Sequence, residues 1–410
     1  MHDVTVIGAG PAGLFSAWLA ARRGAKARVL AAGINTTHVM PGWLAIFEAP
    51  GSLRAAIERF AAERPDHPYA LAGTDALIDG IQALRELCEP YGLLYAGSLE
   101  GNHLLPTALG AGVAAAYAPL SFTAGDLASA APMLIAGPSG WRDFYPTLCA
   151  ANLSRQGRAA EPFAFDLPEI HAVKFDNIAT GLARLFDRAN VRERVAAQIR
   201  ARLNGAARVG LPAVLGLDDY PHSWQQLQEL IGVPVFEIPT LPPSVPGVRL
   251  YNVFKAALAR AGVPVLLNMP VARMFTDGNR VTAAAVQNVV RETVYRAQNV
   301  ILATGGLYGG GIISDYRGAL RETAIGLPVK GAPQMSEWFA ERFIPATHPI
   351  HYAGIAVDSA LRPIAETGPV IYENVRVVGR ALAGYNGLRE GSTEGVWIAT
   401  AQHVVNTLFA

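Results

Sequence analysis

The chain has 410 residues, of which 51% are hydrophobic and 16% charged, and its formal net charge is +1. This length exceeds what one hydrophobic core usually organises, and the composition excludes intrinsic disorder and predicts a large buried core. The small net charge gives no reason to expect nucleic acid or an anionic surface as a partner.

The amino terminus has the pattern of a strand, a glycine-rich turn and a helix. Asp3–Ile7 is a short apolar run that predicts a buried strand, Pro11–Arg23 has apolar residues at helical spacing, and Lys26–Leu30 indicates a second strand. Together these segments predict half of a Rossmann-type unit.

The turn itself carries a G-x-G-x-x-G motif, formed by Gly8, Gly10 and Gly13. In this setting the first glycine allows a tight turn, the second lets a pyrophosphate approach the backbone, and the third lets the helix pack closely on the strand. Because a helix N-terminus offers N–H groups and a partial positive charge, the motif predicts a nucleotide phosphate at this point.

The acidic residue that normally ends the second strand of such a unit is missing. The strand runs into Ala31, Ala32 and Gly33, and the next carboxylate along the chain is Glu48. Since that carboxylate usually holds a ribose hydroxyl, three readings stay open: recognition through backbone and water, a loosely bound adenosine half, or a mononucleotide ligand.

The middle of the chain alternates helical and extended patterns. We expect helices in residues 50–91, short strands in 94–120, a strand at Met133–Ala136 and a helix from Trp141. Helical structure is expected at Asn177–Leu203, followed by a strand at Ala213–Leu217 and a non-helical proline-rich segment at Pro239–Leu250. A helix at Asn252–Ala261 should precede a strand and hairpin at Val265–Gln298, which turns at Asp277–Asn279.

The last third contains two further glycine-rich turns. A predicted strand, Asn299–Ala303, leads into Thr304-Gly305-Gly306. This segment resembles a second signature found in flavoproteins that have two dinucleotide-binding domains. A strand at Val375–Val378 then leads through Gly379 to a helix from about Gly395. The dipole of that helix would favour a phosphate or an anionic reduced flavin.

These patterns predict an α/β fold with two domains. A Rossmann-like FAD/NAD(P)-binding domain is expected from residues 1–80 and 296–410, with an inserted α+β substrate or cap domain at residues 81–295.

Several other chemistries are not expected. Gly137-Pro138-Ser139-Gly140 lacks the spacing of a nucleophile elbow, and the two cysteines form no C-x-x-C pair. We expect no metal site, because no ligand cluster accompanies His348 and His351. No signal peptide is evident, and the weakly charged stretch Gly101–Trp141 is too broken by proline to span a membrane.

The sequence resembles, over nearly its whole length, the flavoprotein subunit, designated B, of the anaerobic glycerol-3-phosphate dehydrogenase family. The resemblance depends on the N-terminal glycine motif and above all on the proline string from Pro239 to Leu250. It is also carried by His67-Pro68-Tyr69, Leu134–Trp141, Gly354–Pro363 and the strand before Gly379. One departure is the segment Arg389–Gly395, which carries two carboxylates where the family has a denser glycine cluster.

The resemblance implies a flavoprotein subunit that carries FMN and relays electrons from glycerol 3-phosphate oxidation toward quinone. It further implies a larger FAD-containing dehydrogenase subunit and an iron–sulfur membrane-anchor subunit as partners. The expected location is the cytoplasm, with any contact to the inner membrane made through a partner.

Two alternative functions stay open. In the first, the chain is a self-sufficient flavin dehydrogenase or oxidase that acts on a hydroxy acid or an amine, with His351 as the base and Arg362 as the anion clamp. In the second, it is an assembly subunit without flavin. Arg362 has an equally weighted alternative, in which it only pairs with Asp358. FAD also stays open as the flavin, because the glycine motif is of the dinucleotide type. The expected cofactor-binding residues are Gly8, Gly10, Pro11, Ala12, Gly13, Ala31, His38, Gly42, Ala303, Thr304, Gly305, Gly379 and Gly395.

Overall fold

A computed structural model describes residues 2–33, 36–171, 178–287, 292–331, 334–342, 347–365 and 368–410. The chain divides into two compact units. The first contains residues 1–36, 52–87 and 253–410, and the second contains residues 37–51 and 88–252.

The first unit is built around a mixed sheet. Among the described residues its strands lie in the order β11-β2-β1-β14-β13-β12, and β17 also pairs with β14. The parallel strands are β1 (His2–Ile7), β2 (Ala27–Leu30), β11 (Val265–Leu266), β14 (Glu292–Leu302) and β17 (Val375–Val377). This arrangement confirms the Rossmann-like α/β fold, with β1 in the interior of the sheet.

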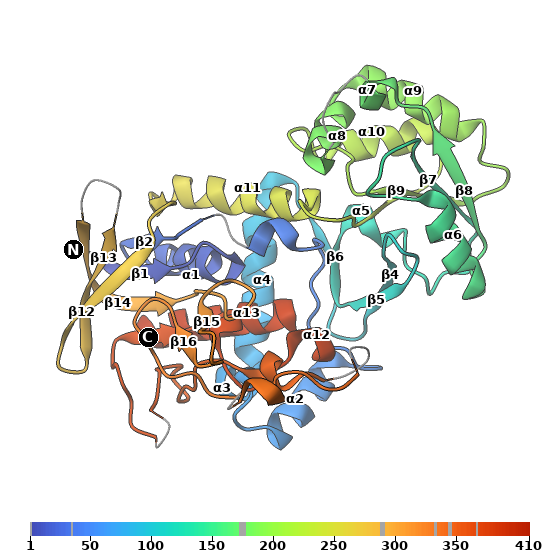
Figure 1. Cartoon of the computed structure of the whole chain (residues 1–410). Coiled ribbons are helices and arrows are strands. Elements are labelled where there is room, and N and C mark those ends of the chain that lie inside the picture. The colour runs from blue at the N-terminus through green and yellow to red at the C-terminus, as the bar shows by residue number, and fades with distance from the viewer. Residues whose placement is uncertain are drawn as a thin grey trace. The chain divides into compact units, whose positions relative to one another are not determined.

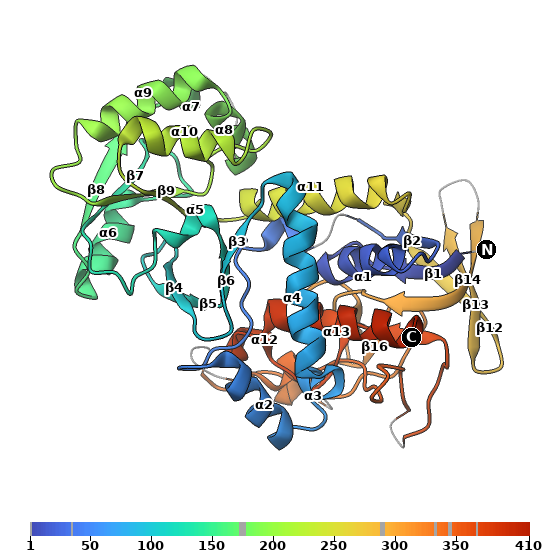
Figure 2. The same ribbon diagram turned by 180° about the vertical axis from the view of Figure 1, so that it is seen from behind.

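Helix α1 (Pro11–Arg22) links β1 to β2 and packs against α13 (Thr393–Leu408). The aromatic ring of Phe15 lies 5.6 Å from that of Trp397, and 6.4 Å from that of Phe254 on α11 (Val245–Arg260). Helix α4 (Thr74–Cys88) crosses this layer (Figure 2), where Gly80 allows close contact: a Cβ atom there would lie 2.7 Å from Ile398. Helices α2 (Leu53–Glu63) and α3 (Pro68–Ala72) lie beside one another, and α3 contacts α13.

An antiparallel hairpin extends the sheet. Strands β12 (Val271–Asp277) and β13 (Arg280–Gln287) pair with each other, and β13 pairs with the first half of β14 (Figure 1). The apolar inner face of the hairpin, including Ala284 and Val286, packs on Leu30 at the end of β2. The hairpin is therefore anchored to the parallel part of the sheet through side chains as well as through strand pairing.

The second unit holds a parallel sheet in the order β10-β9-β7-β8 together with short antiparallel pairs. The sheet strands are β7 (Met133–Pro138), β8 (Ala160–Phe165), β9 (Arg208–Pro212) and β10 (Val235–Ile238). The helices α5 (Leu120–Thr123), α6 (Pro146–Arg155), α7 (Pro168–His171), α8 (Ala179–Phe186), α9 (Ala189–Arg200) and α10 (His222–Ile231) accompany it, and β3 (Tyr95–Gly97), β4 (His103–Pro106), β5 (Gly112–Ala115) and β6 (Tyr117–Pro119) form the antiparallel pairs.

The unit boundaries differ from those expected from sequence. Residues 253–295 belong to the first unit because β11 pairs with β2 and the hairpin pairs with β14. Residues 37–51 belong to the second unit, where the backbone of Leu44 pairs with Tyr117. Long-range strand pairing, which a one-dimensional pattern does not specify, moves both boundaries.

Three predicted elements are wrong in position. Ala213–Leu217 is not a strand, because the strand ends at Pro212. The helix expected from Trp141 begins at Pro146, and α11 begins at Val245, inside the segment expected to be non-helical. The expected helical segment Asn177–Leu203 is two helices, and its first residue lies outside the described ranges.

No helix among the described residues is both long and apolar enough to cross a membrane. Cys88 and Cys149 are both buried and free, and burial raises the pKa of the Cys149 thiol to about 12.

Candidate functional site

The glycine motif lies where the ends of β1 and β14 come together. Gly8 has a φ of +115°, and a Cβ atom on it would lie 2.2 Å from the carbonyl oxygen of Ala303. The two strands are fastened here, because the Ala303 N–H donates to the Ile7 carbonyl over 2.8 Å. The close approach of two backbones therefore requires glycine at position 8.

Gly13 has a related role on α1. A Cβ atom on Gly13 would lie 2.0 Å from the carbonyl oxygen of Gly8, so only glycine lets the helix approach the turn so closely. The first helical position is Pro11, whose fixed φ suits a helix start. Gly10 is the N-cap with φ −74° and ψ 175°, without a side-chain cap or an acidic residue in the first turn. The N–H groups of this turn are therefore left for an anion.

A cavity of about 260 Å³ opens beside this turn. Its wall contains no charged side chain and consists of Ile7, Gly8, Leu30, Ala31, Ala32, Met269, Pro270, Val271, Thr304, Gly309, Gly310, Gly311, Thr323 and Ala324. Typical ligand pockets measure roughly 300–1,000 Å³, so this cavity suits one portion of a nucleotide. The buried Oγ1 atom of Thr304 has no hydrogen-bond partner among the residues that the structure describes, as expected of a group that meets a ligand.

One wall of the cavity is fixed by a buried carboxylate. Glu322 is fully buried, and its two oxygens accept N–H groups of Ala324, Ile325 and Gly326 over 2.8, 2.8 and 3.1 Å. These bonds hold the turn that presents Thr323 and Ala324 to the cavity.

The end of β2 offers backbone in place of a carboxylate. Ala31 is buried, its N–H donates to Leu266 and its carbonyl accepts from Met269. Ala31 and Ala32 line the cavity at the position where a dinucleotide fold normally places an acidic residue. The residues present fit a phosphate-bearing nucleotide at the Gly8–Gly13 turn, and the described residues that line the cavity supply no carboxylate for a ribose hydroxyl.

The glycines that follow β14 and β17 bring further segments to the same end of the sheet. Gly305 and Gly306 have φ values of +89° and +58°, and a Cβ atom on Gly306 would lie 2.4 Å from the carbonyl of Arg380. Gly379 has a φ of +65°, and a Cβ atom there would lie 3.0 Å from that of Ala12. The N–H of Gly379 donates to Thr400 over 3.1 Å, which ties this turn to α13.

A second polar cluster surrounds Arg380, in a hollow of about 20 Å³ that is also lined by Tyr308, His351 and Tyr385. Arg380 donates to Thr393 over 3.1 Å and lies 5.2 Å from the ring centre of Tyr308. The hydroxyl of Tyr385 is buried, and no described residue forms a hydrogen bond with it. Among the described residues, no carboxylate pairs with Arg380.

His351 faces this cluster as a neutral ring. Burial lowers its pKa, and the nearby His348 and Arg380 lower it further. Its Nδ1 atom lies 3.4 Å from the amide nitrogen of Asn386, and its ring centre lies 5.9 Å from that of Tyr308. The neutral form of the ring is therefore favoured, and the same burial and neighbouring cations make it a weaker base than a free imidazole.

Arg362 is held by carboxylates. It pairs with Asp358 over 2.7 Å and also with Glu373. Of the two roles that the sequence left open for Arg362, the geometry favours pairing with Asp358. The cation that accompanies His351 is Arg380, which the sequence reasoning missed. Its position directly after Gly379, at the end of the last strand, was the available signal.

Glu390, one of the two carboxylates near the last helix, is held by hydrogen bonds within the protein. Burial alone would raise the pKa of Glu390, but hydrogen bonds from His67, Asn386 and Ser392 outweigh it and hold that pKa below its usual value. His67 is fully buried and lies 3.2 Å from the carboxylate, while its other ring nitrogen accepts the N–H of Tyr69. Gly395 lies in the first turn of α13, and Ser392 precedes that helix without capping it.

His38 and Gly42 belong to the second unit. The ring of His38 lies 5.0 Å from that of Tyr251. Burial lowers the pKa of His38, and its Nε2 atom is buried without a partner among the described residues. Gly42 has a φ of +101°, and a Cβ atom there would lie 2.4 Å from that of Pro246. Close packing within the second unit therefore accounts for this glycine. Within the described ranges, no group of three His, Cys, Asp or Glu side chains could hold a metal ion.

Comparison with known sequences gives one family and a set of full-length relatives. A family model described as FAD binding domain matches residues 3–396. The anaerobic glycerol-3-phosphate dehydrogenase subunit designated B from Pectobacterium atrosepticum is 28% identical over 419 residues, which cover 99% of this chain and 98% of that protein. The protein of the same name from Mannheimia succiniciproducens is 26% identical and covers 100% of this chain and 98% of its own length.

Solved structures that align with this chain include 3-ketosteroid delta1-dehydrogenase from Sterolibacterium denitrificans. That alignment has a TM-score of 0.47 and 12% identity, and it covers 100% of this chain and 99% of the other. A flavocytochrome c3 fumarate reductase in its open conformation gives a TM-score of 0.46 at 10% identity, and covers 100% of this chain and 78% of that one.

Proposed function

Because the chain belongs to the FAD binding domain family, we propose that it is the flavin-carrying subunit of a quinone-linked glycerol-3-phosphate dehydrogenase. The observation that carries the proposal is the cap-free helix start behind Gly8, beside a cavity whose buried Thr304 hydroxyl has no partner within the described ranges. The relatives named as subunits of anaerobic glycerol-3-phosphate dehydrogenase, which align over nearly the entire chain, support the substrate and the complex.

Within this proposal, the backbone from Gly8 to Gly13 and the adjacent Pro11 and Ala12 hold the phosphate. The nucleotide is lined by Ala31, Ala303, Thr304 and Gly305. Further contacts to it are proposed for Gly379 and Gly395. The cofactor contacts that the sequence predicts for His38 and Gly42 stay predictions. A bound flavin accepts two electrons together and releases them singly, while the protein positions it and excludes water.

We propose FAD as the flavin, because the family is described as FAD-binding and the glycine motif is of the dinucleotide type. FMN is the alternative, and the uncharged end of β2 favours it. Denaturing release of the bound cofactor, followed by chromatography, decides between them. A colourless protein that takes up neither flavin would overturn the proposal and leave a flavin-free assembly subunit.

The cavity wall suggests a gain-of-function test of this choice. Ala32→Glu would place a carboxylate where a ribose hydroxyl is normally bound, and a charged hydrogen bond contributes about 1.5–3 kcal/mol. We expect this variant to bind FAD roughly tenfold more tightly than the parent chain, with little change for FMN. Fluorescence titration measures both affinities, and Ala32→Gln is the control that adds similar size without charge.

The proposed partners are a larger FAD-containing dehydrogenase subunit and an iron–sulfur subunit at the inner membrane, with this chain on the cytoplasmic side. In that arrangement glycerol 3-phosphate reduces the flavin of this chain only when the larger subunit is present. Anaerobic absorbance at flavin wavelengths, with and without that subunit, tests the relay. Bleaching by glycerol 3-phosphate in the isolated chain would contradict it.

A second candidate function is supported by the Arg380 cluster. A guanidinium that no described carboxylate neutralises, beside a neutral His351 and an unpartnered Tyr385 hydroxyl, is what a self-sufficient dehydrogenase of a hydroxy acid needs. The isolated chain would then be bleached by lactate or glycolate, and Arg380→Gln would raise KM more than it lowers kcat. If no hydroxy acid bleaches the isolated chain, this candidate fails.

A further inference from the structure

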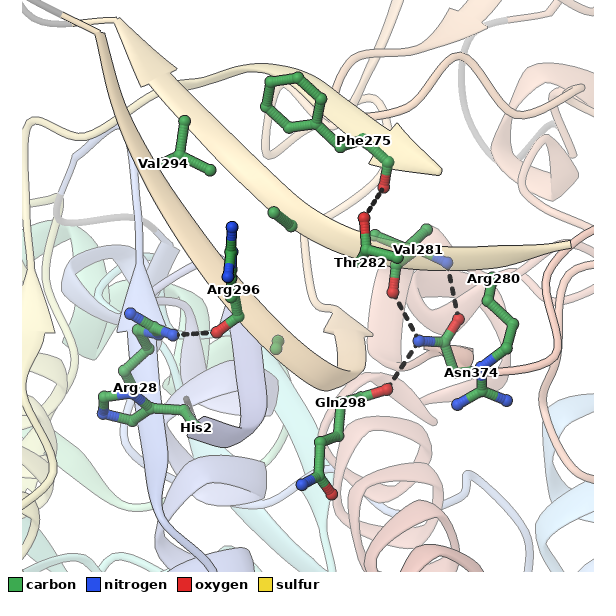
Figure 3. Close-up of a pocket in the computed structure, with 12 residues that line it drawn as sticks. His2, Arg28, Phe275, Arg280, Val281, Thr282, Val294, Arg296, Gln298 and Asn374 are labelled. Carbon is green, nitrogen blue, oxygen red and sulfur yellow. Dashed lines mark hydrogen bonds between the residues drawn. The ribbon is translucent and has the colours of Figure 1, made fainter. Parts of the chain in front are cut away.

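A cleft of about 1,380 Å³ lies in the first unit, on the side of strands β12, β13 and β14 that Figure 3 shows. This volume exceeds the roughly 300–1,000 Å³ of small-molecule pockets. The cleft is lined by His2, Arg28, Phe275, Arg280, Val281, Thr282, Ala283, Val294, Arg296, Ala297, Gln298 and Asn374. It is separate from the nucleotide cavity and shares no residue with it.

The charge of this lining is entirely positive. Arg28, Arg280 and Arg296 contribute three guanidinium groups, and none of the lining residues is acidic. Because the whole chain carries a net charge of only +1, the local excess is not a reflection of a generally basic protein. The pKa of His2 is lowered, first by burial and then by the neighbouring Arg28, so the arginines supply the charge.

Two of the arginines have no partner of their own. Arg280 and Arg296 are exposed, and among the described residues no carboxylate or hydrogen-bond acceptor engages either side chain. Arg28, by contrast, is buried and fixed: it donates to Thr5 over 3.0 Å and to the Arg296 carbonyl, and lies 5.0 Å from the ring centre of Tyr295. Those bonds use two of the five N–H groups of its guanidinium.

The floor of the cleft is rigid and mixed in polarity. Figure 3 shows the amide of Asn374 between the backbones of Val281 and Gln298, with hydrogen bonds of 2.7 and 2.6 Å to their carbonyls. Phe275 and Val294 add apolar surface, and Val294 is 47% exposed. The cleft is therefore preorganised, with cations around apolar contacts, as in protein–protein recognition.

We propose that this cleft is the docking site for a carboxylate-rich segment of a partner protein. The inference rests on the proposed function in one respect, namely that the chain works within a complex. Guanidinium groups bind carboxylates through paired hydrogen bonds, and Phe275 and Val294 would contact apolar atoms of the same segment. An anionic membrane is the less suitable occupant, because a flat surface does not reach into a hollow.

The test uses the full chain with bound flavin and a fluorescein-labelled oligoglutamate peptide as the probe. We expect salt-sensitive binding, weakened about five- to tenfold in the double variant Arg280→Gln/Arg296→Gln. The matched control is Arg59→Gln/Arg85→Gln, which removes the same charge from exposed side chains of α2 and α4 outside the cleft. Fluorescence anisotropy measures each affinity.

Equal weakening in both double variants would overturn the proposal, because net charge alone would then explain the binding. Absence of oligoglutamate binding would overturn it as well. Vesicles containing phosphatidylserine provide the third arm: if the cleft variant loses vesicle binding and keeps peptide binding, the face is a membrane surface and the proposal fails. Flavin content is recorded on the same samples, and glycerol-3-phosphate-dependent reduction is measured after the larger subunit has been added, so failure of the proposed function is seen separately.

Discussion

At position 8 the absence of a single methyl group lets two backbones meet. Strand β1 turns into α1 at the point where the carbonyl of Ala303 approaches, and Gly13 seats the helix on the same turn. The motif therefore has a packing role in addition to the phosphate role that the sequence suggests. The two roles predict different consequences of substitution.

Gly8→Ala should destabilise the first unit, because its Cβ atom would lie 2.2 Å from the Ala303 oxygen at a φ of +115°. We expect a loss of about 2–4 kcal/mol in the free energy of unfolding, from overpacking and backbone strain. Gly33→Ala is the control, since nothing lies within 4 Å of its Cβ position, and it should change stability by less than about 1 kcal/mol. Urea unfolding compares them, and equal losses would contradict the packing role.

The buried pair of His67 and Glu390 gives a pH-dependent prediction. The pKa of Glu390 in the folded chain lies below its usual value of 4.5, so its charged form stabilises the fold above that value. This contribution is lost as the pH falls through the lowered pKa.

Glu390→Gln should therefore cost about 1–3 kcal/mol at pH 7, because an amide nitrogen would face N–H and O–H donors. The difference from the parent chain should shrink as the pH falls below about 4.5. Urea unfolding across this range measures it. Glu86→Gln, at an exposed pair with Arg22, is the control and should change stability by no more than about 1 kcal/mol. A difference that grows on acidification would show that the sign is wrong.

At the scale of elements, the errors of sequence interpretation have local physical causes. Residues 213–217 are apolar and buried, as a strand would be, but side chains take the place of strand-to-strand hydrogen bonds. Leu215 donates its N–H to Glu237, and Arg249 donates to the Gly216 carbonyl. Burial and extended pairing are separate properties, and an apolar run reports only the first.

Helix α11 starts in the proline string because proline is favoured in the first turn. Pro246 is the second helical residue, and the hydroxyl of Ser244 accepts the N–H of Gly247 over 3.2 Å. The same logic begins α6 at Pro146. Proline disrupts a helix in its interior but is compatible with the first turn, so a proline shortly after a capping residue such as Ser244 is consistent with a helix start.

Removing that cap should weaken α11. Ser244→Ala is expected to cost about 1 kcal/mol of stability, because a buried backbone N–H loses its acceptor. Ser52→Ala is the matched control, since Ser52 precedes α2 without making a side-chain cap, and its effect should stay within about 0.5 kcal/mol. Thermal or urea unfolding compares the two, and equal effects would remove the capping argument.

At the scale of the molecule, one of the two compact units holds the predicted phosphate cradle. Ligand binding stabilises a folded chain by mass action, and a ligand at 100 times its Kd contributes about 2.7 kcal/mol. Because the proposed cradle offers backbone N–H groups to a phosphate, we expect the phosphate-bearing flavins to stabilise the chain more than riboflavin does.

The expected order is FAD first, then FMN, with riboflavin without measurable effect at equal concentration. Thermal unfolding of flavin-stripped protein, followed by circular dichroism, measures the shift of Tm. The series is repeated with the Gly8→Ala variant. Its Tm without flavin reports the loss of stability from the altered cradle, and the further shift of Tm on adding flavin reports the loss of flavin binding. An equal shift from riboflavin and FMN would contradict phosphate recognition.

The sequence by itself determined the strand–turn–helix start and the strand that leads to Thr304, because these depend on local periodicity and on glycines that no other residue replaces. The flavoprotein family followed from a resemblance that is carried above all by the proline string from Pro239 to Leu250. The sequence also named His351 as a polar candidate. Tertiary structure decided that Arg380, and not Arg362, accompanies that histidine, that residues 253–295 join the first unit, and that three arginines gather in one cleft. Those outcomes depend on pairing between strands and on which charges neutralise each other, and both are set by contacts between residues far apart in the chain.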